Sequence, residues 1–415
     1  MTVSAIYPTL VIPETLAAGP GPGNTDRRVL TRFAAAGVAD HMQADVLRGM
    51  VECKHMLRAV WGTENTHTFA VAGTGWSGLD AMFSAVGPGD KVVAFVNGTF
   101  SGIDALTLRM KAATAEELAA NPMDPDAASV VVVDVPHGRS VTADVIDAAM
   151  AEHRPRWAFM AHWETGSGRI NDLQAFSDAC ERHDAMGLVD AVSSLGVENF
   201  RIDDFPGVHG WASCPQKGIC CLPLTYAPVS FSDRYIAHLR ANGARTFANH
   251  PILEARHWAI VDGADVEKGA YHRTHSGYAV AAFHEALRLT LEQGIAARAA
   301  EYAYHEAVLR DAVEFMGCEA TSNMTSLVVL NLPEALAGRE AELVANCRAR
   351  GFGIWPTLSA PVQVRIGILN QLKTASIADI VARFAEAMIE LGAEIDLDTV
   401  RARVENSYAA ALAAE

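Results

Sequence analysis

The chain has 415 residues, half of them hydrophobic and a fifth charged, a normal globular balance for two or three domains. Its formal net charge is −16, from 33 basic and 49 acidic residues, which argues against a surface that binds nucleic acid or an anionic membrane. We find no basic N-terminal region followed by an apolar run, and no stretch approaching the roughly 20 apolar residues of a membrane helix. We therefore expect an acidic, soluble, cytoplasmic protein.

The seven cysteines are an odd number without paired spacing, which predicts reduced thiols rather than a disulfide framework in a chain of this length. Cys220 and Cys221 are adjacent. On a strand, adjacent side chains point to opposite faces, so we favour buried structural thiols over a metal or redox pair. The fifteen histidines show no zinc-binding spacing such as HExxH, and we expect no metal site.

The N-terminal residues 1–24 are predicted to form an irregular arm, because Pro20–Gly23 alternates proline with glycine. After the arm, short apolar runs alternate with helical patterns. Such alternation predicts a largely parallel sheet that is covered by helices. The expected strands are Thr68–Gly73, Lys91–Asn97, Ser129–Val135, Trp157–His162, Met186–Val192, Gly210–Cys214 and Ile219–Leu224.

A long helix is expected from about residue 276, and a second set of elements follows it. These elements would make a smaller α/β domain. They are the strand Thr325–Leu330, the helix Arg339–Arg350, the strand Val362–Ile368 and the helix Ile377–Leu391. We therefore expect an arm at 1–24, a large domain at 25–287 and a small C-terminal domain at 288–415.

A glycine-rich segment, Gly73–Gly78, opens a helix after the first predicted strand. Glycines let backbone N–H groups approach an anion, and a helix N-terminus favours a phosphate. The spacing also fits the dinucleotide fingerprint GxGxxG, but that site needs an acidic residue at the end of the second strand, where this chain has Asn97. A phosphate-binding loop is therefore favoured over a nicotinamide dinucleotide site and over a plain turn.

An acid and a lysine follow two neighbouring predicted strands. Asp190 ends one strand, and Lys217 comes shortly after the strand that ends at Cys214. Ligands of open α/β sheets bind at the carboxyl ends of strands. Pyridoxal phosphate needs a lysine amine for its Schiff base and a carboxylate that keeps its ring nitrogen protonated. The spacing alone leaves open a surface lysine and a helix-capping aspartate.

The chain resembles the class V, fold type I pyridoxal-phosphate aminotransferases, most closely the alanine–glyoxylate and serine–glyoxylate group. The resemblance runs from about Gly19 to Leu391. It implies a two-domain α/β fold with a mostly parallel seven-stranded sheet, and a homodimer with the cofactor near the subunit interface. The segments that carry it, in family order, are His162–Gly168, Asp190–Gly196, Gln216–Gly218, Tyr271–Thr274 and Arg365–Gly367.

The resemblance implies a role for each matching position around the cofactor. Lys217 would hold pyridoxal phosphate and act as the catalytic base, and Asp190 would hold its ring nitrogen. Phe100 and Val192 would pack on the two ring faces, and Thr165 would hydrogen-bond the phenolic oxygen. The residues expected at the phosphate are Thr74, Gly75, Trp76 and Gln216.

Other matching positions concern the partner subunit and the substrate. Tyr271 and Thr274 would reach the phosphate of the neighbouring subunit. Gly21 and Asn24 lie in the arm that resembles the family's substrate-side loop. Arg365 would grip the substrate carboxylate, since a guanidinium can bind a carboxylate through two hydrogen bonds. The implied reaction moves an amino group from a small amino acid such as alanine or serine to a 2-oxo acid such as glyoxylate or pyruvate.

The sequence departs from the family pattern at several positions, and other functions stay open. Pro215 precedes Gln216, Trp76 is bulky for its position, and Ile219–Pro223 lacks the usual double proline and glycine. A lyase or cysteine desulfurase of the same fold is the first alternative, although Cys318 and Cys347 do not lie in a glycine- and serine-rich loop. A nicotinamide oxidoreductase and a binding protein with an inactive cofactor pocket are more remote.

Overall fold

Apolar, β-branched runs form the strands of the central sheet, which suits strands that helices cover on both faces. The computed structural model describes residues 10–12, 14–35, 40–120, 129–359, 361–370 and 372–412, so part of the predicted arm lies outside the described residues. Within them, the sheet has seven strands. Their order across the sheet is β2 (His67–Ala72), β10 (Tyr226–Phe231), β9 (Val208–Ala212), β8 (Met186–Asp190), β5 (Trp157–Ala161), β3 (Val92–Val96) and β4 (Val130–Asp134).

The sheet is mostly parallel. Strands β9, β8, β5, β3 and β4 pair in parallel, and β10 is antiparallel to both of its neighbours. Strand β2 therefore runs in the same direction as the parallel set. The carboxyl ends of these strands meet at one edge of the sheet, where polar residues follow them: Gly73, Asn97, His162, Asp190 and Ser213.

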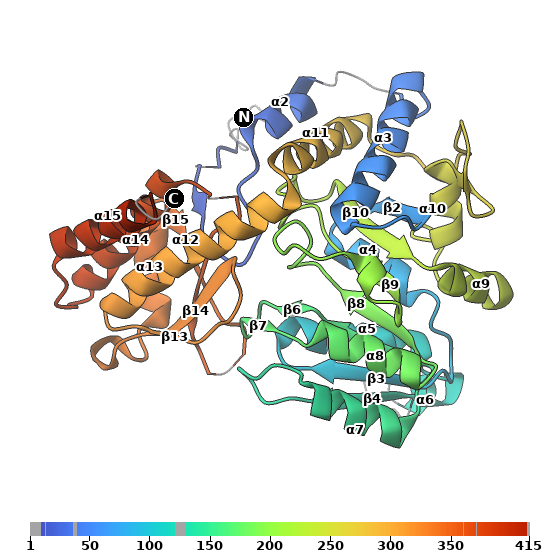
Figure 1. Ribbon diagram of the computed structural model, residues 1–415, viewed down its shortest axis with the longest axis horizontal. Coiled ribbons are helices and arrows are strands. Elements are labelled where there is room, and N and C mark those ends of the chain that lie inside the picture. Colours follow the sequence, from blue (N-terminus) through green and yellow to red (C-terminus); the bar gives the residue numbers. More distant parts are fainter. Residues whose placement is uncertain are drawn as a thin grey trace, which may run out of the picture.

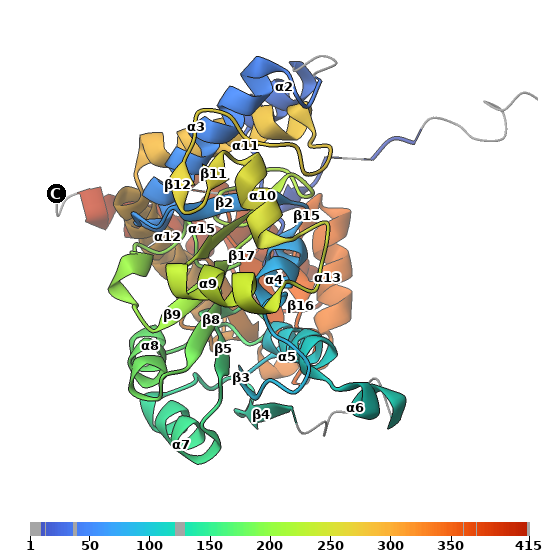
Figure 2. The same ribbon diagram turned by 90° about the vertical axis from the view of Figure 1, so that its right-hand side faces the viewer.

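Helices cover both faces of this sheet. Figure 2 shows α4 and α5 on one side and α7 and α8 on the other. Strands β3, β5, β8 and β10 accordingly have few exposed residues, and one large hydrophobic cluster includes side chains from both faces. The helices of this part are α2 (Arg27–Ala35), α3 (Ala44–Trp61), α4 (Gly75–Phe83), α5 (Thr99–Ala112), α6 (Ala115–Ala120), α7 (Ala143–His153), α8 (Leu173–Arg182), α9 (Asp233–Asn242), α10 (Pro251–His257) and α11 (Gly277–Gln293).

A second, antiparallel sheet lies beyond α11, with a hydrophobic cluster of its own (Figure 1). Its strands in order are β13 (Glu319–Ala320), β14 (Leu327–Asn331), β17 (Val364–Gly367) and β16 (Trp355–Pro356). The two clusters agree in outline with a large and a small domain, whose boundaries at 25–287 and 288–415 stay predictions. The helices of this part are α12 (Ile295–Phe315), α13 (Glu340–Ala349), α14 (Thr374–Glu390) and α15 (Leu397–Leu412).

Two local predictions were wrong. The segment Ile219–Leu224 is a turn rather than a strand, because Cys220 and Leu224 have positive φ angles of 54° and 62° and the Cys221 N–H donates back to the Pro215 carbonyl. The next strand of the sheet is β10 instead. The arm is not wholly irregular either, because β1 (Leu16–Ala17) pairs in parallel with β15 (Phe352–Gly353).

The remaining predicted strands begin and end within two residues of the observed ones.

All seven cysteines are free and buried, which agrees with reduced structural thiols. In the part of the chain that the structure describes, no helix has both the length and the apolar character needed to cross a membrane.

Candidate active site

The acid and the lysine that follow two strands of the sheet line one cavity of about 200 Å³. Asp190 ends β8, and Lys217 lies in the loop after β9. The Lys217 Nζ donates a hydrogen bond of 2.8 Å to the Ser193 hydroxyl and a longer one of 3.4 Å to the Thr165 hydroxyl. The lysine amine is therefore fixed inside the cavity rather than extended into solvent.

Burial lowers the pKa of Lys217 below its usual range. The nearby Cys214, Asp190 and Glu164 oppose this shift, because negative charge favours the ammonium form. Burial is the largest of these effects, so the fraction of neutral amine is greater than for a lysine in water. A neutral amine is the form that attacks a carbonyl or accepts a proton.

Asp190 is almost fully buried, and its Oδ1 accepts a hydrogen bond of 2.6 Å from the Val192 N–H. Burial raises the pKa of Asp190 to about 6, although the Val192 N–H and the charge of Lys217 act to lower it. The carboxyl group is thus mostly ionised at neutral pH. A buried carboxylate of this kind stabilises a cationic ring nitrogen placed beside it.

The glycine-rich segment after β2 forms the start of helix α4. Thr74 is the N-cap, and its side chain makes no capping hydrogen bond. A Cβ at Gly75 would lie 3.0 Å from Val192 Cγ2 and 3.1 Å from Cys214 Cβ, so a larger residue would crowd the cavity wall. The Gln216 Oε1 is buried and has no hydrogen-bond partner among the described residues. A helix N-terminus whose N-cap hydroxyl makes no capping bond suits a phosphorylated ligand.

Phe100 and Val192 both line the cavity, as the sequence predicts for the residues that contact the cofactor ring. Phe100 lies in the first turn of α5, and the Lys217 Nζ is 5.4 Å from the centroid of its ring. Trp76 lines the same cavity and is 43% exposed. Aromatic and aliphatic walls on a polar floor are typical of a site for a flat heterocycle.

Arg365 lies on β17 beside this cavity rather than in its wall. Its Nη1 donates to the Thr165 carbonyl at 3.0 Å, and its Nε and Nη2 donate to the Pro356 carbonyl at 3.2 and 2.7 Å. Burial lowers the pKa of Arg365 to about 10, against the charge of Glu164. A guanidinium has five N–H donors, so two stay available to a ligand.

The two predicted arm residues differ in position. Gly21 lines the cavity, has φ +132°, and would place a Cβ 3.2 Å from the Lys217 side chain, so glycine is required there. The Asn24 side chain does not line it. It forms hydrogen bonds of 3.0 and 2.6 Å with the Ala17 backbone and of 3.3 Å with the Leu369 carbonyl. Asn24 therefore fixes the arm that presents Gly21.

Tyr271 and Thr274 lie outside the cavity and are exposed, with their hydroxyls 3.5 Å apart. The buried Glu254 holds their segment in place. Arg273 Nε donates to Glu254, and nitrogens of His272 and His275 lie 3.2 and 3.3 Å from its carboxylate. A buried carboxylate thus fixes a loop whose two hydroxyls face outward.

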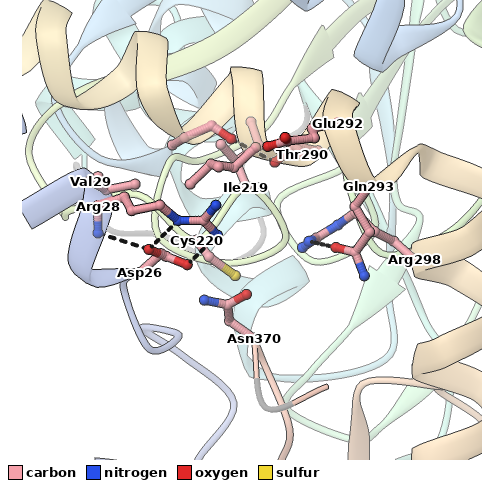
Figure 3. A pocket seen from close by; sticks show the side chains of 12 residues that line it. Asp26, Arg28, Val29, Ile219, Cys220, Thr290, Glu292, Gln293, Arg298 and Asn370 are labelled. Carbon is pink, nitrogen blue, oxygen red and sulfur yellow. Dashed lines mark hydrogen bonds and ion pairs between the residues drawn. The ribbon is translucent and has the colours of Figure 1, made fainter. Parts of the chain in front are cut away.

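A second cavity, of about 330 Å³, lies behind the lysine loop (Figure 3). The Cys220 thiol donates to the Lys217 carbonyl at 2.8 Å. Arg298 donates to the Gly218 carbonyl at 2.7 Å and to the Gly196 carbonyl at 3.1 Å. Two residues that line this cavity, Cys220 and Arg298, therefore hold the loop that carries Lys217.

Two residues of the first cavity, Ser193 and Asp104, have no role that the sequence predicts. Ser193 lies within the motif Asp190–Gly196, and the structure places its hydroxyl against the lysine amine. Asp104 is fully buried in α5, one turn after Phe100. Asp104 could have been noticed in the sequence, because it is an acidic residue on a helix face whose other buried residues are small or apolar.

His162 is structural, since burial lowers its pKa to about 3 and its Nδ1 lies 3.0 Å from the Ser194 hydroxyl.

No family model matches the chain, but individual proteins do. The alanine–glyoxylate aminotransferase of Oryctolagus cuniculus is 29% identical over 296 residues, which cover 70% of this chain and 69% of that protein. The (S)-ureidoglycine–glyoxylate transaminase of Bacillus subtilis (strain 168) is 26% identical over 353 residues, which cover 81% and 80%.

Solved structures of such enzymes are also similar. The ureidoglycine–glyoxylate aminotransferase of Bacillus subtilis superimposes with a TM-score of 0.84 and 21% identity, covering 96% of this chain and 99% of that one. The alanine–glyoxylate aminotransferase of Nostoc sp. superimposes with a TM-score of 0.81 and 25% identity, covering 91% and 96%.

Proposed function

We propose that this protein moves an amino group between small metabolites. It is a homologue of the alanine–glyoxylate and ureidoglycine–glyoxylate aminotransferases and has the class V pyridoxal-phosphate fold. The donor would be a small amino acid of the alanine or serine type. The acceptor would be a small 2-oxo acid such as glyoxylate or pyruvate. One observation carries the proposal: the Lys217 amine and the Asp190 carboxylate face the same cavity beside a free helix N-terminus.

The residues around this cavity fit the cofactor. The start of α4 suits its phosphate, and Asp190 suits its ring nitrogen. When bound, pyridoxal phosphate supplies an electron sink for the charge left after the substrate's α-proton is removed. The residues proposed to hold it are Lys217, Asp190, Thr74, Gly75, Trp76, Phe100, Thr165, Val192 and Gln216.

Lys217 is the proposed base. Its amine is held by the Ser193 and Thr165 hydroxyls inside the cavity, and its lowered pKa increases the neutral form. The Nζ can therefore accept the proton that leaves the substrate's α-carbon and return it later. Asp190, as an anion, would keep a proton on the ring nitrogen of the bound cofactor.

Two features support a small substrate that carries a carboxylate. The cavity has a volume of about 200 Å³, and the arm at Pro20, Gly21 and Pro22 forms part of its wall, which leaves little room for a long side chain. Arg365 has two N–H donors left, and the residue whose carbonyl it binds, Thr165, also has its hydroxyl 3.4 Å from the Lys217 Nζ. We propose that these donors bind the substrate's α-carboxylate.

We further propose a cytoplasmic homodimer. Tyr271 and Thr274 are exposed on a segment that Glu254 holds in place. Residues that complete the phosphate site of a partner subunit would need this exposure and this fixed position. The buried free cysteines suit a reducing compartment. Light scattering should give a dimer, and Thr274→Ala should lose cofactor on dilution more readily than wild type. A fully active monomer would contradict the dimer.

The other functions have less support. A cysteine desulfurase needs a mobile, reactive thiol near the substrate, and every cysteine of this chain is buried. A nicotinamide site needs an acidic residue at the end of β3, where Asn97 stands instead and bonds to Asn171.

The test is a pair of half-reactions followed by the visible spectrum of the purified protein. Alanine and serine, added separately, should each convert the cofactor to its amine form and release pyruvate or hydroxypyruvate. Glyoxylate, added next, should restore the starting spectrum and yield glycine. Sulfide release from cysteine with no spectral change for alanine or serine would instead support a desulfurase.

A further inference from the structure

A second carboxyl group lies in the wall of the candidate active site. Asp104 projects from α5 one turn after Phe100 and lines the same cavity as Lys217 and Asp190. Its side chain is fully buried. Neither of its oxygens accepts a hydrogen bond from a donor group among the described residues, and the carboxyl group that lies within hydrogen-bonding reach is that of Asp190. A buried polar group without a partner is uncommon in a folded protein and calls for an explanation.

The charged groups that face Asp104 already have partners. Asp190, at the end of β8, accepts the Val192 N–H. Glu164, on β6 (Trp163–Glu164), accepts hydrogen bonds of 2.7 Å from both the N–H and the hydroxyl of Ser101 and of 2.6 Å from the Gly166 N–H. Lys217 donates to Ser193 and Thr165. No cation or N–H among these groups is directed at Asp104.

The position of Asp104 disfavours its charged form. Burial, together with the negative charges of Asp190 and Glu164, raises the pKa of Asp104 well above its usual range. Two carboxyl groups this close cannot both ionise without a large electrostatic cost. Between them, Asp190 has the N–H donor and the nearer cation, so it is the one that ionises.

We propose that Asp104 is a positioning residue of the cofactor site, which stays neutral and donates its carboxyl O–H to Asp190. The pair then carries one negative charge and one proton, and no proton has to leave Asp104 during the reaction. The Asp104 oxygen that faces Asp190 obtains a partner in this way. The other oxygen still has no donor, which costs a neutral acid less than it would cost a carboxylate.

The second half of the inference rests on the proposed function. A hydrogen bond donated to Asp190 stabilises its anion and makes it a weaker base. A weaker base leaves the proton on the cofactor's ring nitrogen instead of taking it. Asp104 would therefore help to keep the ring nitrogen protonated without touching it.

The first test concerns Asp104 alone and does not depend on the reaction. The infrared difference spectrum of the purified holoenzyme, wild type minus Asp104→Asn at neutral pH, should contain the C=O band of a neutral carboxylic acid. A carboxylate band in its place would overturn the proposal. This measurement needs no substrate, so it stands even if the proposed transamination fails.

The second test separates the hydrogen bond from the charge. Asp104→Asn keeps a neutral donor to Asp190, whereas Asp104→Leu has a similar size and no donor. With ¹⁵N-labelled pyridoxal phosphate, the NMR shift of the ring nitrogen reports its protonation against pH. Wild type and Asp104→Asn should agree. In Asp104→Leu the signal should move towards that of an unprotonated ring nitrogen at the same pH, because Asp190 without this hydrogen bond is the stronger base and takes a larger share of the proton between them. Removal of a hydrogen bond to a charged group corresponds to a roughly tenfold to hundredfold change in that share.

The other outcomes would overturn the proposal. Equal profiles for all three proteins would mean that Asp104 contributes nothing to Asp190. Profiles in which Asp104→Asn matches Asp104→Leu and both differ from wild type would mean that Asp104 is ionised. If Asp104→Leu does not fold, as judged by its thermal melting, the infrared band and the Asp104→Asn profile still decide between a neutral and an ionised Asp104.

Discussion

The Lys217 amine donates a 2.8 Å hydrogen bond to the hydroxyl of Ser193, three residues after Asp190 in the loop that follows β8. This bond joins the two strand-end loops that supply the acid and the amine. It also sets the direction of the Lys217 side chain, since the other hydroxyl in reach, that of Thr165, is 3.4 Å away. The position of the proposed base therefore depends on Ser193, which is neither the lysine nor the acid of the proposed pair.

Replacement of Ser193 by alanine should slow the reaction without preventing cofactor binding. The lost hydrogen bond amounts to about 0.5–1.5 kcal/mol, so kcat should fall by roughly twofold to tenfold. Ser194→Ala is the matched control, because the Ser194 hydroxyl lies against His162 rather than Lys217. Steady-state kinetics of both variants check this. An equal loss of kcat in the two would show a general effect of the loop.

Replacement of Asp190 by asparagine should weaken the electron sink. The ring nitrogen would lose its anionic partner, and the barrier should rise by several kcal/mol, where about 1.36 kcal/mol corresponds to tenfold in rate. The phosphate contacts at α4 and the Lys217 amine are untouched, so the purified variant should still be yellow. Single-turnover kinetics with alanine provide the measurement, and near-normal turnover would contradict the role of Asp190.

Replacement of Arg365 by alanine should discriminate between substrates. Loss of one partner of a desolvated charged pair costs about 2–5 kcal/mol, so kcat/KM for alanine should fall by roughly 30-fold to several thousand-fold. An amine without a carboxylate should be affected much less, and the resting visible spectrum should hardly change. Arg365→Lys should restore only part of kcat/KM for alanine, because lysine keeps the charge but lacks the planar guanidinium that can donate two parallel hydrogen bonds. Equal losses for both substrates would exclude Arg365 as the carboxylate clamp.

The strand ends and the position of Asp190 and Lys217 at one cavity could be predicted from the sequence, because apolar runs mark the strands and polar residues stand at or after their ends. The segment Ile219–Leu224 has the same apolar character, but it packs behind the lysine loop, where two positive φ angles prevent a strand. Asp104 could not be given a role, because its partner Asp190 is distant in sequence and on a different element. Likewise, the sequence does not indicate that the Asn24 side chain bonds to the arm's own backbone.

The loop that presents Tyr271 and Thr274 should lose stability in acid. Burial alone would raise the pKa of Glu254, but contacts with His272, His275 and Arg273 lower it to about 2. The pKa of this carboxyl group is lower in the folded protein than in the unfolded chain. Such a group stabilises the folded protein at pH values above the pKa that it has in the unfolded chain. That contribution is lost as the pH falls from about 4.5 towards 2.

Glu254→Gln should therefore lower the free energy of unfolding by about 3 kcal/mol at neutral pH, and the gap to wild type should narrow below pH 4.5. Urea unfolding at a series of pH values measures this gap. The exposed Glu267 offers a control, since Glu267→Gln should change stability little at any pH. A gap that stays constant with pH would mean that the charge of Glu254 is not what stabilises the loop.

The most direct test of the whole account is to locate the lysine that carries the cofactor. The purified protein is incubated with pyridoxal phosphate and reduced with borohydride, and the modified peptide is then identified by mass spectrometry. We expect a yellow protein whose cofactor is fixed on the peptide that contains Lys217, with no such product in Lys217→Ala. A colourless protein, or a label on a different lysine, would contradict it.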